Sequence, residues 1–162
     1  MSDTAGSHPP DPAGARLRGP WSLDEIRRYL DATVIPVRLA AEAPSGWPLV
    51  VSVWFAREGG ELLCATSPNS ALVLALDRRP RCAFEVAADE PPYRGVRGRA
   101  EVVIDHDAGA ETLERLLIRY LGRLDGPLAR RLLKRSADEV CLRLRPVSLS
   151  SWDYTARMAP EP

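Results

Sequence analysis

A group of polar residues in the middle of the chain could bind a phosphate. Thr66, Ser67, Asn69 and Ser70 follow a short apolar stretch and precede a leucine-rich one, which predicts a junction between a strand and a helix. A helix N-terminus offers free backbone N–H groups and the positive end of the helix dipole, and both attract anions. The alternative is that Ser67 only caps the helix, with Pro68 in its first turn. Spacing alone favours this capping role.

Other side chains could line a site for a planar ring. Ser52 is the one polar residue in an apolar segment, where it could bond a ring carbonyl or simply face outward, opposite Val51 and Val53. Trp54 and Trp152 could wall such a site, because aromatic faces suit ring-shaped ligands. We expect Trp152 at the edge of a pocket and Trp54 in packing contacts.

Two arginines have a spacing that places them together. Arg97 and Arg99 alternate with small or apolar residues, so both side chains should leave the same face of a strand. A solvated face is the ordinary interpretation of this pattern. The pair also provides the best candidates for contacts with a phosphate.

Histidine and cysteine offer little for catalysis or metal binding. His106 stands alone at an expected turn, while Cys64, Cys82 and Cys141 are far apart and form no Cys-x-x-Cys pair. We therefore expect no metal site, and we expect the cysteines to be reduced and packed as small hydrophobic side chains. No grouping of nucleophile, base and orienting residue is evident. Any chemistry would then be carried by a cofactor that the protein positions.

Composition limits the possible partners. The chain has 162 residues, enough for one domain, with 22 basic and 22 acidic side chains. This balance argues against a nucleic-acid partner. No apolar run approaches the roughly 20 residues of a membrane span, and residues 1–19 lack the apolar centre of a signal peptide. We expect a cytoplasmic protein with a disordered, Pro- and Gly-rich tail at 1–19, a folded domain at 20–156 and a C-terminal tail at 157–162.

Six strand-like segments and several helices should position these residues. Ser22 to Glu25 has the pattern of a capping box, which predicts a helix at 23–30. Further helices are expected between Ser67 and Pro80, at 107–121 ending at Gly122, and at 127–135. The expected strands are 33–41, 49–55, 61–66, 81–88, 94–105 and 139–152. Because six antiparallel strands in an open sheet would leave two bare edges, we expect a mainly β fold closed into a small barrel with flanking helices.

The order of these elements resembles the pyridoxamine-5′-phosphate-oxidase-like flavin-binding split barrels, over about residues 21–154. The motifs that carry the resemblance are Val50–Phe55, Gly59-Gly60 and Cys64-Ala65-Thr66 for the family's central hairpin, Ser70-Ala71-Leu72 with Leu76–Arg81 for the following helix, Tyr93–Glu101 for the strand ending in Gly-x-Ala-Glu, and Arg145-Pro146 with Trp152 for the closing segment. The resemblance implies a six-stranded antiparallel split barrel with flanking helices.

The resemblance also implies a cofactor site and a function. The cofactor-binding residues it implies are Val51, Ser52, Val53, Thr66, Ser67, Ser70, Tyr93 and Trp152. The expected cofactor is FMN, with a deazaflavin as the alternative and haem or no cofactor less favoured. The implied function is that of an oxidoreductase acting on a small molecule. The alternative is a non-catalytic dimeric barrel that binds or senses flavin or haem.

Departures from the family pattern narrow the activity. The basic pair that holds the flavin phosphate falls on Ala71 and Leu72, and the arginine that opens the central strand falls on Val50. Beyond Tyr154, only Arg157 could stand in for the residues that bind pyridoxamine, so true pyridoxamine phosphate oxidation is not expected. A small barrel is filled by its own side chains, so a ring-sized ligand must lie outside it and needs a second wall. We therefore expect a homodimer.

Overall fold

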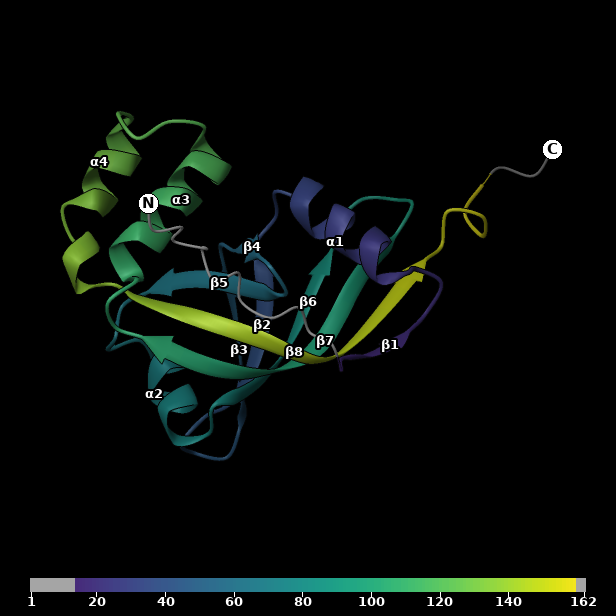
Figure 1. Cartoon of the computed structure of the whole chain (residues 1–162), viewed down its shortest axis with the longest axis horizontal. Coiled ribbons are helices and arrows are strands. Elements are labelled where there is room, and N and C mark those ends of the chain that lie inside the picture. Colours follow the sequence, from purple (N-terminus) through teal and green to yellow (C-terminus); the bar gives the residue numbers. More distant parts are fainter. Residues whose placement is uncertain (1–13, 160–162) are drawn as a thin grey trace, which may run out of the picture.

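Most of the chain forms one mainly antiparallel sheet with helices on its flanks (Figure 1). The structure is a computed structural model, and it describes residues 14–159. The strands of this part are β1 (Arg16–Arg18), β2 (Val37–Glu42), β3 (Pro48–Val53), β4 (Ala56–Glu58), β5 (Glu61–Thr66), β6 (Arg81–Ala87), β7 (Arg94–Asp105) and β8 (Val140–Asp153). The helices are α1 (Leu23–Ala32), α2 (Ala71–Arg78), α3 (Gly109–Leu121) and α4 (Pro127–Leu133), with a short 3₁₀ helix at Ser136–Asp138.

The sheet confirms the β-rich fold with flanking helices and corrects the expected closure. The strands follow the order β3-β2-β6-β7-β8-β5-β4, and β1 runs parallel to β8 beside this path. The ends of the path, β3 and β4, are not joined by hydrogen bonds, although β3 approaches β5 closely enough for contact. The barrel is therefore open rather than closed. β4 is only three residues long, and a short edge strand protects a sheet from pairing with other chains.

The helix ends follow local capping rules, with one correction. At α1, the Ser22 hydroxyl accepts a hydrogen bond from the Glu25 N–H at 3.3 Å, and the Ser22 N–H donates to the Glu25 carboxylate at 2.7 Å. The N-cap of α2 is Ser70, which accepts from the Val73 N–H, and not Ser67. Ser67 instead accepts from the Asn69 N–H within the preceding turn. Both serines are good capping residues, and the turn at 67–70 decides between them because it places Ser70 at the first helical turn.

Two hydrophobic cores hold the elements together. The main core fills the space between the inner sheet face, α1 and α2, and its fully buried members include Ile26, Phe55 and Leu76. The second core lies between α3, α4 and neighbouring segments, where Trp54 packs against the cluster. Trp54 stacks on Tyr120 with ring centroids 4.8 Å apart, which confirms its packing role.

The segment before α1 differs from the expected disordered tail. Residues 1–13 lie outside the described part, but residues 14–20, here called the N-terminal arm, carry β1 along β8. Gly19 adopts a positive φ of 94°, and a Cβ there would lie 2.0 Å from the Ser151 carbonyl oxygen. The buried Ser151 hydroxyl accepts a hydrogen bond from the Trp21 N–H at 3.1 Å. The arm is ordered because β8 offers it a free edge and Gly19 allows the close approach.

The C-terminal segment folds back on the start of β7. The Tyr154 N–H donates to the Tyr93 carbonyl at 3.0 Å, and the Met158 N–H donates to the Tyr154 carbonyl at 2.9 Å. The expected tail at 157–162 is thus described up to residue 159, while residues 160–162 lie outside the described part.

Candidate functional site

The outer face of the sheet carries two rows of side chains that run across six strands. Residues directly opposite one another on paired strands lie on the same face. The strand register gives the first row as Arg18, Ser150, Arg97, Glu85, Arg38 and Ser52. The second row is Arg16, Ser148, Arg99, Ala83, Ala40 and Val50. The intervening residues, such as Leu39, Val96 and Leu149, are buried in the main core.

These rows line a broad groove of about 730 Å³, here called the arginine groove. This volume lies within the roughly 300–1,000 Å³ of small-molecule sites. Arginines stand along the groove, and the small side chains of Ala40 and Ala83 leave its floor flat. Val50 is 65% exposed at one side of it. The arginine groove can therefore receive a flat ring and an anionic group together.

Four of its five arginines have no acidic partner. Arg38 pairs with Asp89 at 2.5 Å and with Glu85 at 3.7 Å, so its charge is balanced. Within residues 14–159, no ion pair involves the four others, which are Arg16, Arg18, Arg97 and Arg99. Uncompensated charges of one sign in a concave surface attract ligands of the opposite sign. The groove is accordingly suited in charge to an anionic ligand, and Arg97 and Arg99 share it as their alternation predicted.

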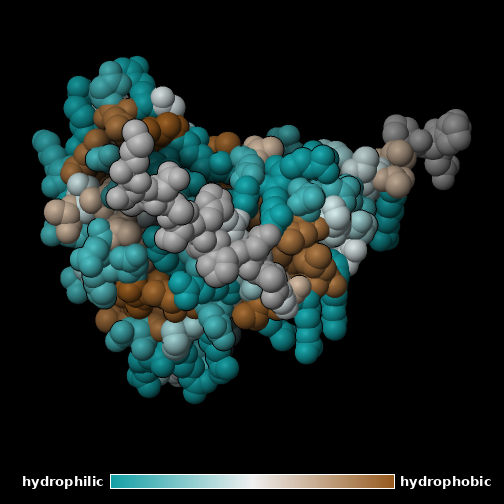
Figure 2. Space-filling view, in the orientation of Figure 1, coloured by the Kyte–Doolittle hydropathy of each residue, from teal (hydrophilic) through white to brown (hydrophobic). Residues whose placement is uncertain are grey.

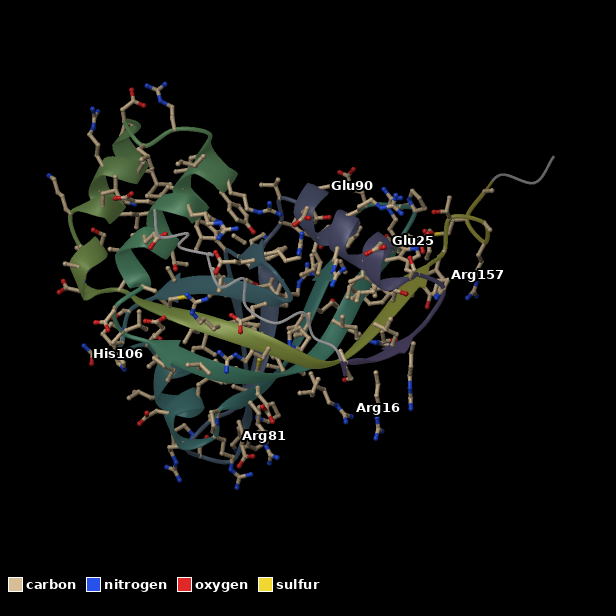
Figure 3. All side chains as sticks on the ribbon, viewed as in Figure 1. Arg16, Glu25, Arg81, Glu90, His106 and Arg157 are labelled. Atoms are coloured by element: carbon tan, nitrogen blue, oxygen red, sulfur yellow. The ribbon has the colours of Figure 1, made fainter. Side chains whose placement is uncertain are left out.

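In the view of Figure 3, Arg16 and Arg81 project from the sheet on the side away from α1. Figure 2, in the same orientation, shows hydrophilic side chains reaching beyond apolar surface at this side of the molecule. α1 and the arginine groove therefore lie on different sides of the sheet.

Two of the site residues expected from the sequence share the outer face. Ser52 is exposed and lies opposite Arg38 in the first row. Trp152 lies opposite Gly95, at the end of the same face, and the Arg97 guanidinium sits 5.4 Å from the centre of its ring. A Cβ on Gly95 would lie 2.7 Å from the Trp152 ring. Glycine at position 95 thus allows the tryptophan to lie flat against the strand.

The other expected residues lie elsewhere. The side chains of Val51 and Val53 pack against the main core, so only their backbone could meet a ligand on the outer face. Thr66 ends β5, with Ser67 and Ser70 in the turn before α2, and none of them lines the arginine groove.

Tyr93 is exposed just before β7, near Trp152, which pairs with Gly95 of that strand. Thr66 instead pairs with Val140. The group at Thr66–Ser70 and the group of Tyr93 and Trp152 therefore stand near opposite ends of β8. Fourteen residues of extended strand span on the order of 45 Å. One small ligand cannot reach both groups within a single chain.

A separate network of charges lies between β5, β7 and β8. Glu61 is only 5% exposed, and it accepts hydrogen bonds from Arg145 at 2.6 Å and from Arg143 at 3.3 Å. Arg143 also donates to Glu58 and to Asp105. Burial tends to raise the pKa of Glu58, but hydrogen bonds from neighbouring arginines outweigh it and lower that pKa. These charges satisfy one another, so the network stabilises the fold and does not present a ligand site.

The cysteines are poor nucleophiles in this environment. All three are buried and free, as the sequence predicts. Burial raises the pKa of Cys82 to about 11 and that of Cys64 well above its ordinary value. Both thiols are therefore protonated near neutral pH, when a thiolate would be needed for attack. Within residues 14–159, no three His, Cys, Asp or Glu side chains gather where they could hold a metal ion.

Several groove residues were missed by the sequence analysis. Arg16 and Arg18 lie in the segment expected to be disordered, although the Arg-Leu-Arg alternation is a strand signal. Ser148 and Ser150 alternate with Leu149 in the same way. Arg38 and Glu85 gave no signal, because only the register of β2 against β6 shows that they meet.

Solved structures share this fold. A conserved hypothetical protein, Rv2991 from Mycobacterium tuberculosis, aligns with a TM-score of 0.74 at 22% identity, covering 88% of this chain and 91% of its own. A protein described as an F420 reductase aligns with a TM-score of 0.66 at 27% identity, covering 81% of this chain and 98% of its own. HutZ, described as the haem storage protein from Vibrio cholerae, aligns with a TM-score of 0.55 at 15% identity over 76% of this chain and 87% of its own.

These neighbours define the class to which the fold belongs. No protein-family model matches the sequence, and no curated protein matches it closely enough to count as a relative. The fold is that of the small split barrels, with a groove on the outer face of the sheet. It is consistent with the pyridoxamine-5′-phosphate-oxidase-like group of flavin and deazaflavin proteins, as the sequence resemblance implied. None of the helices in residues 14–159 is long and apolar enough to cross a membrane.

Proposed function

We propose that the chain binds a flavin-type cofactor, FMN or a deazaflavin, in the arginine groove and acts as an oxidoreductase on a small molecule. The observation that carries the proposal is the combination of a flat floor with four unpaired arginines in one groove of suitable volume. A flavin-type cofactor is a flat ring system joined to an anionic tail. The floor of the groove can contact the ring, and the arginines can bind the tail. The likeness to a structural neighbour described as an F420 reductase supports the same cofactor class.

Different residues of the groove would contact the ring and the anionic tail of the cofactor. Ala40, Ala83 and the exposed Val50 provide an apolar surface on which a ring can lie. Arg97 and Arg99 offer planar guanidinium groups, which form paired hydrogen bonds with phosphate or carboxylate oxygens. They replace the basic pair of the family pattern, which falls on Ala71 and Leu72 in this chain.

When bound, the cofactor would supply hydride transfer. The protein would orient the ring, balance the charge of the tail and keep water from one face of the ring. Ser52 stands beside the groove and could donate a hydrogen bond to a ring carbonyl. Trp152 stands at the end of the same face, where it could limit the size of the substrate.

A homodimer is part of this proposal. The arginine groove is open on one side, whereas small-molecule sites bury most of the ligand. The sequence-expected residues also fall into two groups near opposite ends of β8, which one copy of the chain cannot bring to the same ligand. A twofold dimer would place the turn at 66–70 of one copy over the groove of the other, and it would do so twice.

Haem fits the groove less well than a flavin. The iron of haem needs an axial ligand such as His, Cys, Met or Tyr. Among residues 14–159, none of these residue types lines the arginine groove, and His106 lies at a distant turn after β7. We therefore do not propose for this chain the haem storage by which HutZ is described.

Cofactor titration tests the proposal directly. Purified chain would be titrated with FMN and with F420 while flavin or deazaflavin fluorescence is followed. Removing one charge-assisted contact typically costs about 1.5–3 kcal/mol, so Arg97→Gln should weaken binding by roughly 10-fold or more. The matched control is Arg131→Gln on α4, an exposed arginine far from the groove, which should bind as the unchanged chain does.

The outcomes separate the parts of the proposal. Failure of both cofactors to bind, or equal affinity in Arg97→Gln and the unchanged chain, would contradict the placement of the cofactor. Light scattering would report the oligomeric state. A monomer that binds its cofactor with full affinity would contradict the dimer.

A further inference from the structure

We infer that the N-terminal arm and β7 together form a subsite for an oligoanion, a ligand or ligand segment that carries two or more anionic groups. The inference rests in part on the proposed function, because the subsite adjoins the place proposed for the cofactor ring. It goes further in assigning a binding role to Arg16 and Arg18, which precede the folded domain expected from the sequence.

The subsite is a rectangle of four arginines. Arg16 and Arg18 leave β1 on the same face, and Arg99 and Arg97 leave β7 in the matching rows. β8 runs between them. With strands about 4.8 Å apart and a rise of about 3.3 Å per residue, the Cα corners are separated by roughly 10 Å across the strands and 7 Å along them.

Two hydroxyl groups stand at the centre of this rectangle. Ser148 lies between Arg16 and Arg99, and Ser150 lies between Arg18 and Arg97. Within residues 14–159, neither hydroxyl makes a hydrogen bond to another group of the protein. Four guanidinium groups, which can only donate, thus surround two hydroxyl groups, which can also donate, so the set offers many donors to an anionic ligand.

The spacing indicates more than one anionic group. A single phosphate accepts paired hydrogen bonds from one or two guanidinium groups, which leaves the far corners of a rectangle this size unmatched. Like charges held close together repel one another, and the nearest groove carboxylate, Glu85, lies beside Arg97 outside the rectangle and pairs with Arg38 at 3.7 Å. Anionic groups separated by about 7–10 Å would satisfy both sides of the rectangle at once.

The arm is held weakly, which makes it responsive to such a ligand. All three residues of β1 are exposed, and even Leu17 is 44% exposed, so apolar burial contributes little to its position. Its attachment consists of one edge of backbone pairing and the contacts of Ser151 with Trp21 and Arg18. Segments of this kind open locally at low free-energy cost. A ligand that contacts both the arm and β7 must therefore stabilise the docked arm.

The test compares simple anions with cofactors on matched variants. Tripolyphosphate is the oligoanionic probe without a ring, FMN carries a single phosphate, and F420 carries a longer anionic tail. The variant Arg16→Gln/Arg18→Gln removes the arm corners, and Arg16→Lys/Arg18→Lys keeps their charge. The control Arg130→Gln/Arg131→Gln removes two exposed arginines from α4. Affinities would be measured calorimetrically at fixed ionic strength, because charge contacts weaken with salt.

We expect the arm glutamine variant to lose at least 10-fold in tripolyphosphate affinity, the lysine variant to keep most of it, and the α4 control to keep all of it. In hydrogen exchange, tripolyphosphate should increase the protection of amides at 16–18 and 148–151 in the unchanged chain. FMN affinity should change by less than threefold in the arm variant. An arm variant that binds tripolyphosphate as well as the unchanged chain, or a control that loses as much, would overturn the inference.

The same measurements separate the source of the anion and the two proposals. If F420 competes with tripolyphosphate and loses affinity in the arm variant, the oligoanion is the tail of the cofactor. If tripolyphosphate binds to chain already saturated with F420, the subsite belongs to a separate anionic substrate. If neither cofactor binds and tripolyphosphate still depends on the arm, the subsite stands and the proposed cofactor fails.

Discussion

The hydroxyl group of Tyr120 helps to hold the segment that follows β3 in place. It accepts a hydrogen bond from the Phe55 N–H at 3.2 Å and donates one to the Ile35 carbonyl at 2.8 Å. It thereby ties α3 to two connecting segments, one before β2 and one after β3. The ring below the hydroxyl stacks on Trp54. Tyr120→Phe removes both hydrogen bonds and keeps the stacked ring.

The expected cost can be worked from these contacts. A typical internal hydrogen bond contributes about 1 kcal/mol, and leaving a buried donor without a partner costs about 1–3 kcal/mol. Phe55 is fully buried, so its N–H would be left unpaired, while the Ile35 carbonyl lies in a more accessible place. We expect Tyr120→Phe to lower the free energy of unfolding by roughly 2–3 kcal/mol. For a chain of this size, that corresponds to a fall in Tm of about 5–10 °C.

Urea unfolding followed by tryptophan fluorescence measures the effect. The midpoint should move to lower urea with an unchanged slope, because the surface exposed on unfolding stays the same. Tyr154→Phe is the matched control, since Tyr154 is exposed and the phenylalanine keeps the ring beside Arg157. If the two variants lose equal stability, or if Tyr120→Phe loses less than about 0.5 kcal/mol, the bridging role of the hydroxyl is refuted.

Two further predictions concern titratable groups. The pKa of Glu58 in the folded chain lies below its ordinary value of 4.5, so the stability that its carboxylate provides is full above pH 4.5 and is lost as the pH falls through the lower, folded pKa. The urea midpoint should therefore fall in this acidic range, and it should fall less in Arg143→Met, which lacks the hydrogen bond from Arg143 to Glu58. An identical fall in both proteins would contradict the role of Arg143. The three buried cysteines, of which Cys82 has its pKa raised to about 11, should react with a thiol reagent at pH 8 only after urea unfolding, and rapid reaction of the native chain would show that they are accessible.

The strands β3 and β5 and the helices α1 and α3 could be predicted from the sequence, because each carries capping, turn or propensity signals within its own segment. β3 and β5 start and end within two residues of their expected limits, since apolar and β-branched residues are bounded by glycine turns. The capping box fixed the start of α1, and Gly122 marked the end of α3 with φ of 74°. These signals lie within a few residues of one another, so no distant contact is needed to interpret them.

Local sequence patterns did not predict the shortest strands, nor which face of a strand points toward the core. β1 and β4 have three residues each, so even the Arg-Leu-Arg alternation of β1 is too short to identify a strand by itself. The alternation in β3 separates Ser52 from Val51 and Val53, but it does not say which set faces the core. Contacts with the main core decide that Val51 and Val53 point inward. The arginine groove needs the register of six strands, and a shift of one residue in any strand would turn its side chains to the other face.

The equal number of basic and acidic side chains in the whole chain gave no indication of the arginine groove. Several acidic residues lie in ion pairs away from the groove, as with Glu61 beside Arg143 and Arg145, and the groove's own Glu85 pairs with Arg38. Their charge is used up locally, so it does not balance the arginines of β1 and β7. Net charge averages over the whole chain, whereas a ligand responds to the charge within a Debye length of about 8–10 Å. Arg-x-Arg occurs at 16–18, 79–81, 97–99 and 143–145, so this spacing alone does not single out the groove. Arg143 and Arg145 pair with Glu61, whereas no ion pair within residues 14–159 involves the arginines at positions 16, 18, 97 and 99. The register of β1, β8 and β7 is what brings these two pairs together in the arginine groove.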